Sequence, residues 1–204
     1  MDLTGLFVFA AALAVAAASP GPTITALVAR VLVRGTSGAL AFMLGLQVGE
    51  IVWLTAAILG LAFIATTFGM LFLVLKYAGA AYLAYLAWRM WTAPAGAHDA
   101  PAPKAEHPLR LFLAAVSLTL GNPKIMVFYL ALLPNLIDLG TVTVLGYVEL
   151  VLVTLAILTA IDGGYVLLAA RARKLFSSPR AVRLVNRGSG VLLAGAAAAI
   201  ATRS

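Results

Sequence analysis

The sequence contains no cysteine and very little charge. Only 10% of its 204 residues are Asp, Glu, Lys or Arg, whereas 63% are hydrophobic. The absence of cysteine excludes disulfides, thiolate metal sites and thiol relays, and with them the membrane disulfide reductases. The mean hydropathy of +1.06 is too high for an ordinary water-soluble domain. These figures predict an all-α integral membrane protein.

Two further absences narrow the function. The chain has two histidines, His98 and His107, and both lie between apolar segments, so it lacks the His-rich tract expected of a metal exporter. It also lacks a glycine loop with the GK[ST] signature, which argues against ATP hydrolysis. No cofactor is expected, and a transporter built on this chain would take its energy from an ion or solute gradient.

Long apolar segments dominate what remains. Crossing about 30 Å of hydrocarbon takes roughly 20 helical residues. On this basis we predict six transmembrane helices, near residues 4–28, 38–63, 67–91, 110–133, 142–170 and 184–202. The run from Leu6 to Ala18 also resembles a signal peptide, but Asp2 replaces the positive start and the apolar stretch resumes beyond Pro22. We therefore assign it to the first span.

Most positive residues lie in alternate connections between the spans. The net charge is +7, and Lys and Arg are absent from the loops after spans 2 and 4. By the positive-inside rule the charged connections are cytoplasmic, so both termini face outward, with Arg203 as the one exception. This distribution also argues against a nucleic-acid partner, which would favour a continuous basic face. The charges in question are Arg30, Arg34, Arg89, Lys104, Arg110, Arg171, Arg173, Lys174, Arg180, Arg183 and Arg187.

A linker rich in Ala and Pro, residues 93–109, divides the chain into two halves, 1–92 and 110–204. Each half holds three predicted spans. Because three is odd, the second half would be inserted upside down relative to the first, which is the inverted-repeat plan of many secondary transporters.

Helix breakers occur inside two of the apolar spans. Ser19-Pro20-Gly21-Pro22 interrupts the first span and Gly121-Asn122-Pro123-Lys124 interrupts the fourth. A proline inside a spanning helix is kept where protein or a water-lined cavity satisfies the freed backbone groups. At 1.5 Å per residue both breaks lie about 20 Å from their starting surfaces, so they can face each other. Paired breaks of this kind indicate a transport site.

Each restarted half-helix can direct free N–H groups toward an anion. Gly21 and Asn122 suit the N-cap position, and Pro22 and Pro123 suit the first helical position. A helix N-terminus binds carboxylates or phosphates well. Hydroxyl and ammonium groups nearby would strengthen such a site, and these are Thr23, Thr25, Lys76 and Lys124.

Acidic residues complement these groups. Glu50 in span 2 and Asp162 in span 5 lie within apolar segments, and Gln47 shares a helical face with Glu50. Burying each ion costs at least about 2.5 to 3.5 kcal/mol, so such residues are functional candidates as ammonium partners or proton carriers. A structural ion pair of Glu50 with Lys76 is the alternative, and Asp162 can instead lie near the cytoplasmic end.

Several segments together resemble the LysE/RhtB family of amino-acid exporters over essentially the whole chain. They are Ser-Pro-Gly-Pro at 19–22 before a basic cluster, the stretch 45–50, Gly-Ala-Ala-Tyr-Leu at 79–83 and Leu-Gly-Asn-Pro-Lys at 120–124. The sequence departs from the family pattern at Glu50, where many relatives have Asp, and at Ala87, where a glycine is frequent.

The resemblance implies export of amino acids from the bacterial cytoplasm through the inner membrane, driven by the proton-motive force. The pattern is more similar to homoserine, threonine and leucine exporters than to lysine and arginine exporters. The substrate site then comprises Pro20, Gly21, Pro22, Thr23, Gln47, Glu50, Lys76, Asn122, Pro123 and Lys124, and Glu50 and Asp162 are the proton-coupling candidates. A homodimer is left open.

Three other interpretations stay open. A divalent-cation exporter related to the same family would lack Cys and intramembrane His ligands. An intramembrane enzyme would need a nucleophile and base, and Ser19, Ser117 and Ser189 have no evident partner in the sequence. A scaffold subunit would leave the buried charges without a purpose.

Overall fold

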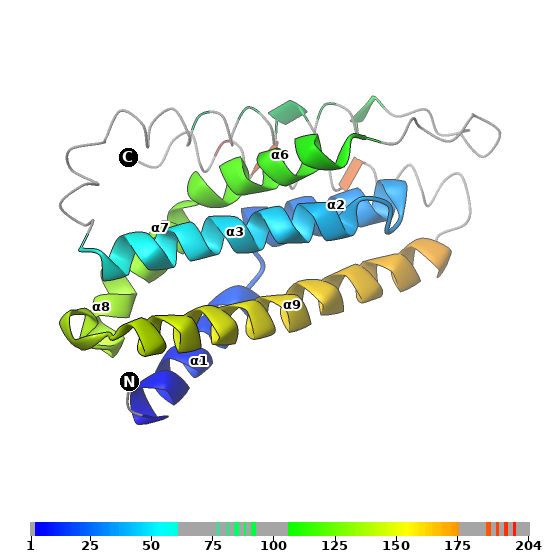
Figure 1. The fold of residues 1–204 in the computed structure, drawn as a ribbon. Coiled ribbons are helices and arrows are strands. Elements are labelled where there is room, and N and C mark those ends of the chain that lie inside the picture. Colours follow the sequence, from blue (N-terminus) through cyan, green and yellow to red (C-terminus); the bar gives the residue numbers. More distant parts are fainter. Residues whose placement is uncertain are drawn as a thin grey trace.

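The computed structural model describes residues 3–60 and 106–175, with scattered positions within 77–92 and 187–198. Every element in the two continuous ranges is helical (Figure 1). The third and sixth predicted spans, and Lys76 with them, lie largely or wholly outside the described residues. The inverted repeat, which needs both halves complete, stays a prediction.

The first span is broken where the sequence predicted. Helix α1 covers Leu3–Ala18 and α2 covers Pro22–Arg34, and the two helices meet at an angle of 52°. Gly21 is the N-cap of α2 with extended backbone, and Pro22 occupies the first turn. A proline in that position gives up an N–H that would have no partner inside the helix. The break therefore fits the local sequence without strain.

Helix α3, Ala39–Ile58, packs closely along α6, Pro108–Leu120. Two glycines of α3 allow this approach. A Cβ on Gly45 would collide with the Phe112 carbonyl oxygen, and a Cβ on Gly49 would lie 2.5 Å from the Cβ of Thr119. Small residues spaced four apart let helix backbones approach in lipid, where no hydrophobic force drives helices together.

The fourth span is also broken as predicted. After α6 the chain restarts as α7, Pro123–Val127, and continues through a π-helical turn η1, Phe128–Leu132, into α8, Leu133–Leu136. The bend between α6 and the segment 123–136 is 53°. The π-helical turn lies just before Pro134, which has no N–H for the Leu130 carbonyl and crowds it. A short 3₁₀ turn, η2 at Leu139–Thr141, follows.

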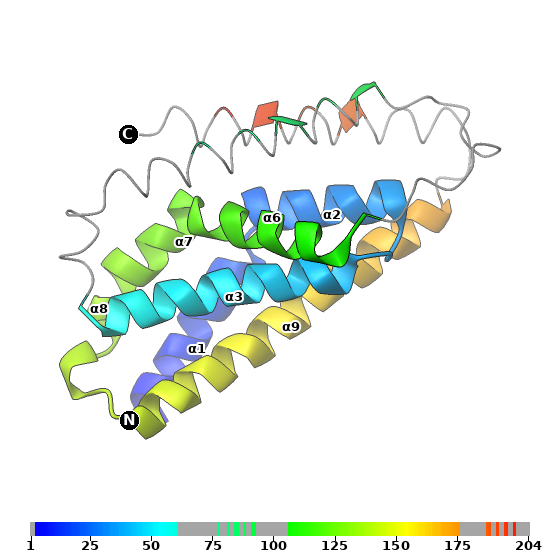
Figure 2. The same ribbon diagram turned by 45° about the horizontal axis from the view of Figure 1, so that its top comes forward.

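Helix α9, Val144–Leu175, is the longest of the described helices and runs the length of the bundle (Figure 1). It contacts α1, α2 and α3. By length and composition α3 and residues 144–173 of α9 can each cross a membrane, and each bent pair can form one further span. Within the described residues up to four of the six predicted spans are thus present. Figure 2 shows α1 lying behind α3 and α9, and α2 lying alongside α6.

Two separate apolar clusters fill the interior. The cluster at the α2 end joins α2, the first half of α3, α6 and the last part of α9. The cluster at the α1 end joins α1, the second half of α3, the segment 125–137 and the first part of α9. Glu50 lies on α3 between Leu46 of one cluster and Leu54 of the other. A polar layer therefore separates the two clusters at the level of the helix breaks.

Candidate functional site

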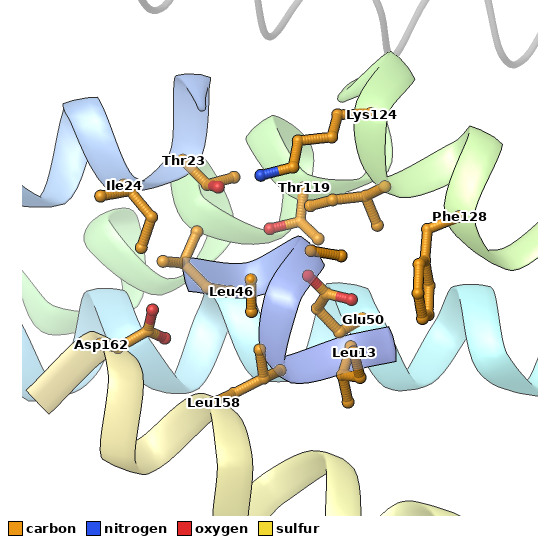
Figure 3. Close-up of a pocket in the computed structure, with 13 residues that line it drawn as sticks. Leu13, Thr23, Ile24, Leu46, Glu50, Thr119, Lys124, Phe128, Leu158 and Asp162 are labelled. Carbon is orange, nitrogen blue, oxygen red and sulfur yellow. The ribbon is translucent and has the colours of Figure 1, made fainter. Parts of the chain in front are cut away.

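A cavity of about 40 Å³ lies in this polar layer, where the two broken helices meet α3 and α9 (Figure 3). Polar and charged side chains share its wall with apolar ones. The lining residues are Leu13, Ala16, Ala17, Thr23, Ile24, Leu46, Glu50, Thr119, Lys124, Ile125, Phe128, Leu158 and Asp162. Segments from both halves of the sequence thus contribute to one site.

Three ionisable groups converge on the cavity. Glu50 of α3 and Asp162 of α9 are 9% and 4% exposed, and Lys124 of α7 approaches from the second break. Figure 3 shows the two carboxyl groups and the Lys124 ammonium directed into the same space. Asp162 lines the same cavity as Glu50 and Lys124. Asp162 therefore belongs to the cavity wall and not to a peripheral helix end.

The end of α1 is capped by side chains from other helices. Lys124 Nζ donates to the Ser19 carbonyl, and the Tyr165 hydroxyl donates to the Ala18 carbonyl at 2.8 Å. Carbonyls at the end of a helix have no partner within it, and in lipid each unsatisfied group costs several kcal/mol. These two bonds explain how the break at 19–21 is tolerated. Lys124 thus serves the backbone while its side chain also lines the cavity.

The two helix restarts differ in how their N–H groups are satisfied. At the second, Asn122 Oδ1 accepts a hydrogen bond from Lys124 N at 3.1 Å, as an N-cap residue should. At the first, Gly21 has no side chain to cap α2. Thr23 follows directly and lines the cavity. At the start of α2, therefore, no side chain of the N-cap residue competes with a ligand for the first N–H groups of the helix.

Several buried polar atoms around Glu50 have no hydrogen-bond partner of normal geometry. Their residues have no exposed surface, and the atoms are Thr119 Oγ1, Asn122 Nδ2, Tyr129 OH and Thr154 Oγ1. Tyr129 lies next to both Glu50 and Thr154. Buried polar groups in folded proteins are normally paired with protein or with ordered water. A cluster of four such atoms beside a cavity points to a hydrated or ligand-binding region.

The sequence-predicted site residues divide into three groups. Thr23, Glu50, Lys124 and Asp162 line the cavity. A second group shapes or supports the wall without lining it: Pro20, Gly21, Pro22 and Pro123 form the breaks, Asn122 caps α7, and Gln47 donates to Thr159 Oγ1 at 3.0 Å. The third group is Lys76, which lies outside the described residues.

Three residues near Glu50 escaped sequence reasoning. The sequence pattern alone does not single out Thr119, Tyr129 or Thr154. The available signal was weak, since a Thr or Tyr in an apolar span can face lipid, a neighbouring helix or a cavity. Only the rotation of each helix decides among these, and the hydropathy pattern does not fix that rotation for helices that are apolar all round.

A second charged group lies at the α2 end of the bundle. Arg30 is paired with Glu106, and Arg34 Nη2 lies 3.3 Å from the other Glu106 oxygen. Arg30 also donates to the Ser37 carbonyl at 3.1 Å. These contacts join the end of α2 to the residues that precede α6. Elsewhere in the described ranges, no cluster of three His, Cys, Asp or Glu side chains could hold a metal ion.

Comparison with known proteins decides the family. Residues 14–204 match the sequence profile described as "LysE type translocator". The chain belongs to this family. The match spans the two helix breaks and every residue that lines the cavity except Leu13.

Relatives within the LysE family are named as efflux or membrane proteins. The chain is 32% identical over 160 residues to a homoserine/homoserine lactone efflux protein of Salmonella typhimurium, covering 78% of this chain and 77% of that one. It is 25% identical over 186 residues to a leucine efflux protein of Klebsiella pneumoniae (90% and 88%). It is 28% identical over 187 residues to an uncharacterised membrane protein of Vibrio cholerae (90% of each). No solved structure matches significantly. These matches point to an amino-acid efflux transporter and away from an enzyme.

Proposed function

We propose that this protein exports a neutral amino acid, or a close derivative, across the bacterial inner membrane in exchange for protons. The observation that carries the proposal is the cavity between the two broken helices, where two buried carboxyl groups and a lysine face each other. Intramembrane ionisable groups are costly to bury, and they mark substrate or proton sites when they surround a cavity. A scaffold protein has no need of them.

The chemistry of the wall matches the two ends of an amino acid. The substrate carboxylate binds at the start of α2, between the N–H groups after Gly21 and the Lys124 ammonium. The substrate ammonium binds Glu50, with Asp162 as the second acceptor. Protonation of Glu50 from outside then weakens the hold on the ammonium. A proton and a substrate ammonium compete for one carboxylate, and this competition couples their movements.

The remaining wall selects the side chain. Leu13, Leu46, Ile125, Phe128 and Leu158 supply an apolar surface, with Thr119 as a hydroxyl among them. Such a surface favours aliphatic side chains or short ones with one hydroxyl and leaves a charged side chain unpaired. The names of the homoserine and leucine efflux relatives agree with this choice. In this chain we therefore expect homoserine, threonine or leucine as substrate.

The two apolar clusters support the proposal of alternating access. The cavity volume of about 40 Å³ leaves room for roughly three water molecules, which is too little for an amino acid. Substrate entry thus requires one cluster to open while the other stays closed. By the positive-inside rule the α2 end, with Arg30 and Arg34, faces the cytoplasm, so α1 begins outside. Rocking of two inverted repeats would provide the motion.

The test is export from cells fed with dipeptides, with all twenty amino acids and homoserine followed outside the cell by mass spectrometry. We expect selective release that an uncoupler abolishes. Glu50→Gln should lower that release by about tenfold or more, equivalent to ~1.4 kcal/mol or more of lost interaction. Asp138→Asn is the matched control, because Asp138 is exposed and an Asn still accepts from Gly140 N.

Two outcomes would overturn the proposal. One is release equal to that of empty-vector cells for every compound, with the protein confirmed in the membrane. The other is wild-type release by Glu50→Gln with an unchanged pH dependence, which would remove Glu50 from the coupling mechanism. Loss of release in Asp138→Asn as well would mean that the Glu50 result reflects expression and not the site.

A further inference from the structure

Glu50 lies at the boundary between two regions of the protein. On one side its carboxyl group lines the cavity, together with Asp162 and Lys124. On its other side lies Tyr129, which neighbours Glu50 and Thr154 but does not line the cavity. Tyr129 and Thr154 have no exposed surface, and neither hydroxyl has a hydrogen-bond partner of normal geometry. Two buried hydroxyl groups thus lie next to the Glu50 carboxyl group, outside the cavity wall.

Local backbone structure holds Tyr129 in this place. It belongs to the π-helical turn η1, and its ring packs edge-on against Phe128 with ring centroids 5.0 Å apart. Short π-helical turns inside helices occur frequently at functional sites, because the extra residue redirects the side chains around it. Phe128 lines the cavity while Tyr129 is turned away from it. The turn therefore presents two neighbouring aromatic rings to two different regions.

Toward the α1 end of the bundle, a layer of apolar side chains is followed by a second pair of hydroxyl groups. One helical turn beyond Glu50, Tyr129 and Thr154 lie Leu54, Leu133 and Leu150, all three fully buried in the cluster at the α1 end. Thr55 follows Leu54 directly in α3, and Tyr147 lies three residues before Leu150 in α9. Thr55 Oγ1 and Tyr147 OH are 2.8 Å apart, and both residues are partly exposed. A layer of three leucines thus separates two hydroxyl pairs, one buried beside Glu50 and one near the α1 end.

We propose that Tyr129 and Thr154 form the inner end of a proton path that reaches Glu50 from the α1 side, separate from the cavity that holds the substrate. This deepens the proposed function and rests on it. The path runs from Thr55 and Tyr147 across the leucine layer, which must admit water when the α1 end opens, to Thr154 and Tyr129. Proton and substrate then approach one carboxyl group from opposite sides.

The proton transfer balances without an ionised tyrosine. As the Tyr129 hydroxyl gives its proton to the Glu50 carboxylate, it takes another from a water molecule on its Thr154 side. That water takes a proton in turn from the next water of a chain, and the chain ends at a hydronium ion outside, so one external proton is consumed for each Glu50 protonated. Among the described residues, the titratable groups that face Glu50 are Asp162 from α9, Lys124 from α7 and Tyr129 from η1. The parts of α1, α2 and α6 that line the cavity contribute only apolar residues and threonines. Tyr129 is thus the one of these three that lies outside the cavity wall.

The test compares two activities of the full-length protein in liposomes. Exchange of labelled for unlabelled homoserine, threonine or leucine at equal pH needs the substrate site but no net proton movement. Proton entry driven by an outward amino-acid gradient needs both. Tyr129→Phe should keep exchange within about twofold of wild type and reduce proton entry by about tenfold or more, the factor that ~1.4 kcal/mol of coupling represents. Thr154→Val should likewise lower the ratio of proton entry to amino-acid exchange.

Tyr165→Phe is the matched control, since it also removes one tyrosine hydroxyl from the bundle, here the donor to the Ala18 carbonyl. It should leave the ratio of the two activities unchanged. Equal proton entry by wild type and Tyr129→Phe would overturn the path. An equal loss of both activities in Tyr129→Phe would also overturn it, because the hydroxyl would then act on the substrate. Absence of exchange in the wild type for every amino acid would instead refute the proposed function itself.

Discussion

Replacing Gly49 by Ala tests how closely the broken helix packs against α3. A Cβ at position 49 would lie 2.5 Å from the Cβ of Thr119 and 2.7 Å from its Cγ2. Rotation about the Thr119 side-chain bond can move Cγ2 but cannot move Cβ, which is fixed to the backbone. The two helices must therefore separate by about 1 Å to restore ordinary van der Waals contact. Because Thr119 lines the cavity, the separation also changes the site.

The expected cost follows from comparison with a second glycine. Gly164 lies inside α9, and a Cβ there would meet nothing within 4 Å. Gly→Ala inside a helix gains up to about 1 kcal/mol of helix propensity at either position. The difference between the two variants isolates the overpacking, for which core substitutions give about 1 to 3 kcal/mol. In proteins of this length each kcal/mol changes the melting temperature by about 2 to 4 °C.

The assay is thermal unfolding of the purified protein in detergent, followed by tryptophan fluorescence. Trp53 is a suitable reporter because its indole N–H points to the Thr119 carbonyl at 3.4 Å. Gly49→Ala should melt at least about 2 °C below Gly164→Ala. The double change of Gly49→Ala with Thr119→Gly should recover part of the loss, because it removes the Thr119 Cβ and Cγ2 atoms that the new methyl group would meet. Equal melting temperatures for Gly49→Ala and Gly164→Ala would refute the close packing.

Two further predictions concern single contacts. Asn122→Ala should cost about 1 kcal/mol of stability because α7 loses its N-cap, whereas Asn122→Asp should keep the cap. Asn122→Ala should therefore melt at a lower temperature than Asn122→Asp, and equal melting temperatures would contradict the role of the cap. Arg30→Gln should cost about 1.5 to 3 kcal/mol, because Glu106 loses a charged donor and the Ser37 carbonyl loses its bond. A urea midpoint or melting temperature of Arg30→Gln that is no lower than that of the wild type would contradict this value.

The helix breaks were predictable because their chemistry is local. A proline cannot donate a backbone hydrogen bond, so Pro22 and Pro123 each fix the first turn of a new helix whatever the surrounding fold. Asn122 caps its helix as its residue type predicts. Glu50 and Asp162 stood out because an acidic residue in an apolar span has few harmless places to lie. All these features follow from short segments of sequence.

The other half of the site depends on how whole helices are rotated. Thr119 faces the cavity because Gly49 admits α6 at short distance, and no local pattern around Thr119 records that approach. Tyr129 faces Glu50 because the turn before Pro134 is π-helical, which shifts its direction relative to a regular helix. Lys124 was expected to border the cavity, but its bond to the Ser19 carbonyl requires the actual meeting of two breaks about a hundred residues apart.

Proton movement into liposomes that contain the purified protein is the most direct test of amino-acid export in exchange for protons. Vesicles containing the protein, a trapped pH dye and homoserine, threonine or leucine are diluted into medium without amino acid, with the membrane potential clamped by potassium and valinomycin. Exchange of an amino acid for a proton predicts that the lumen acidifies as the amino acid leaves, and that Glu50→Gln abolishes both changes while Asp138→Asn preserves them. Amino-acid efflux without acidification in the wild type would contradict the account.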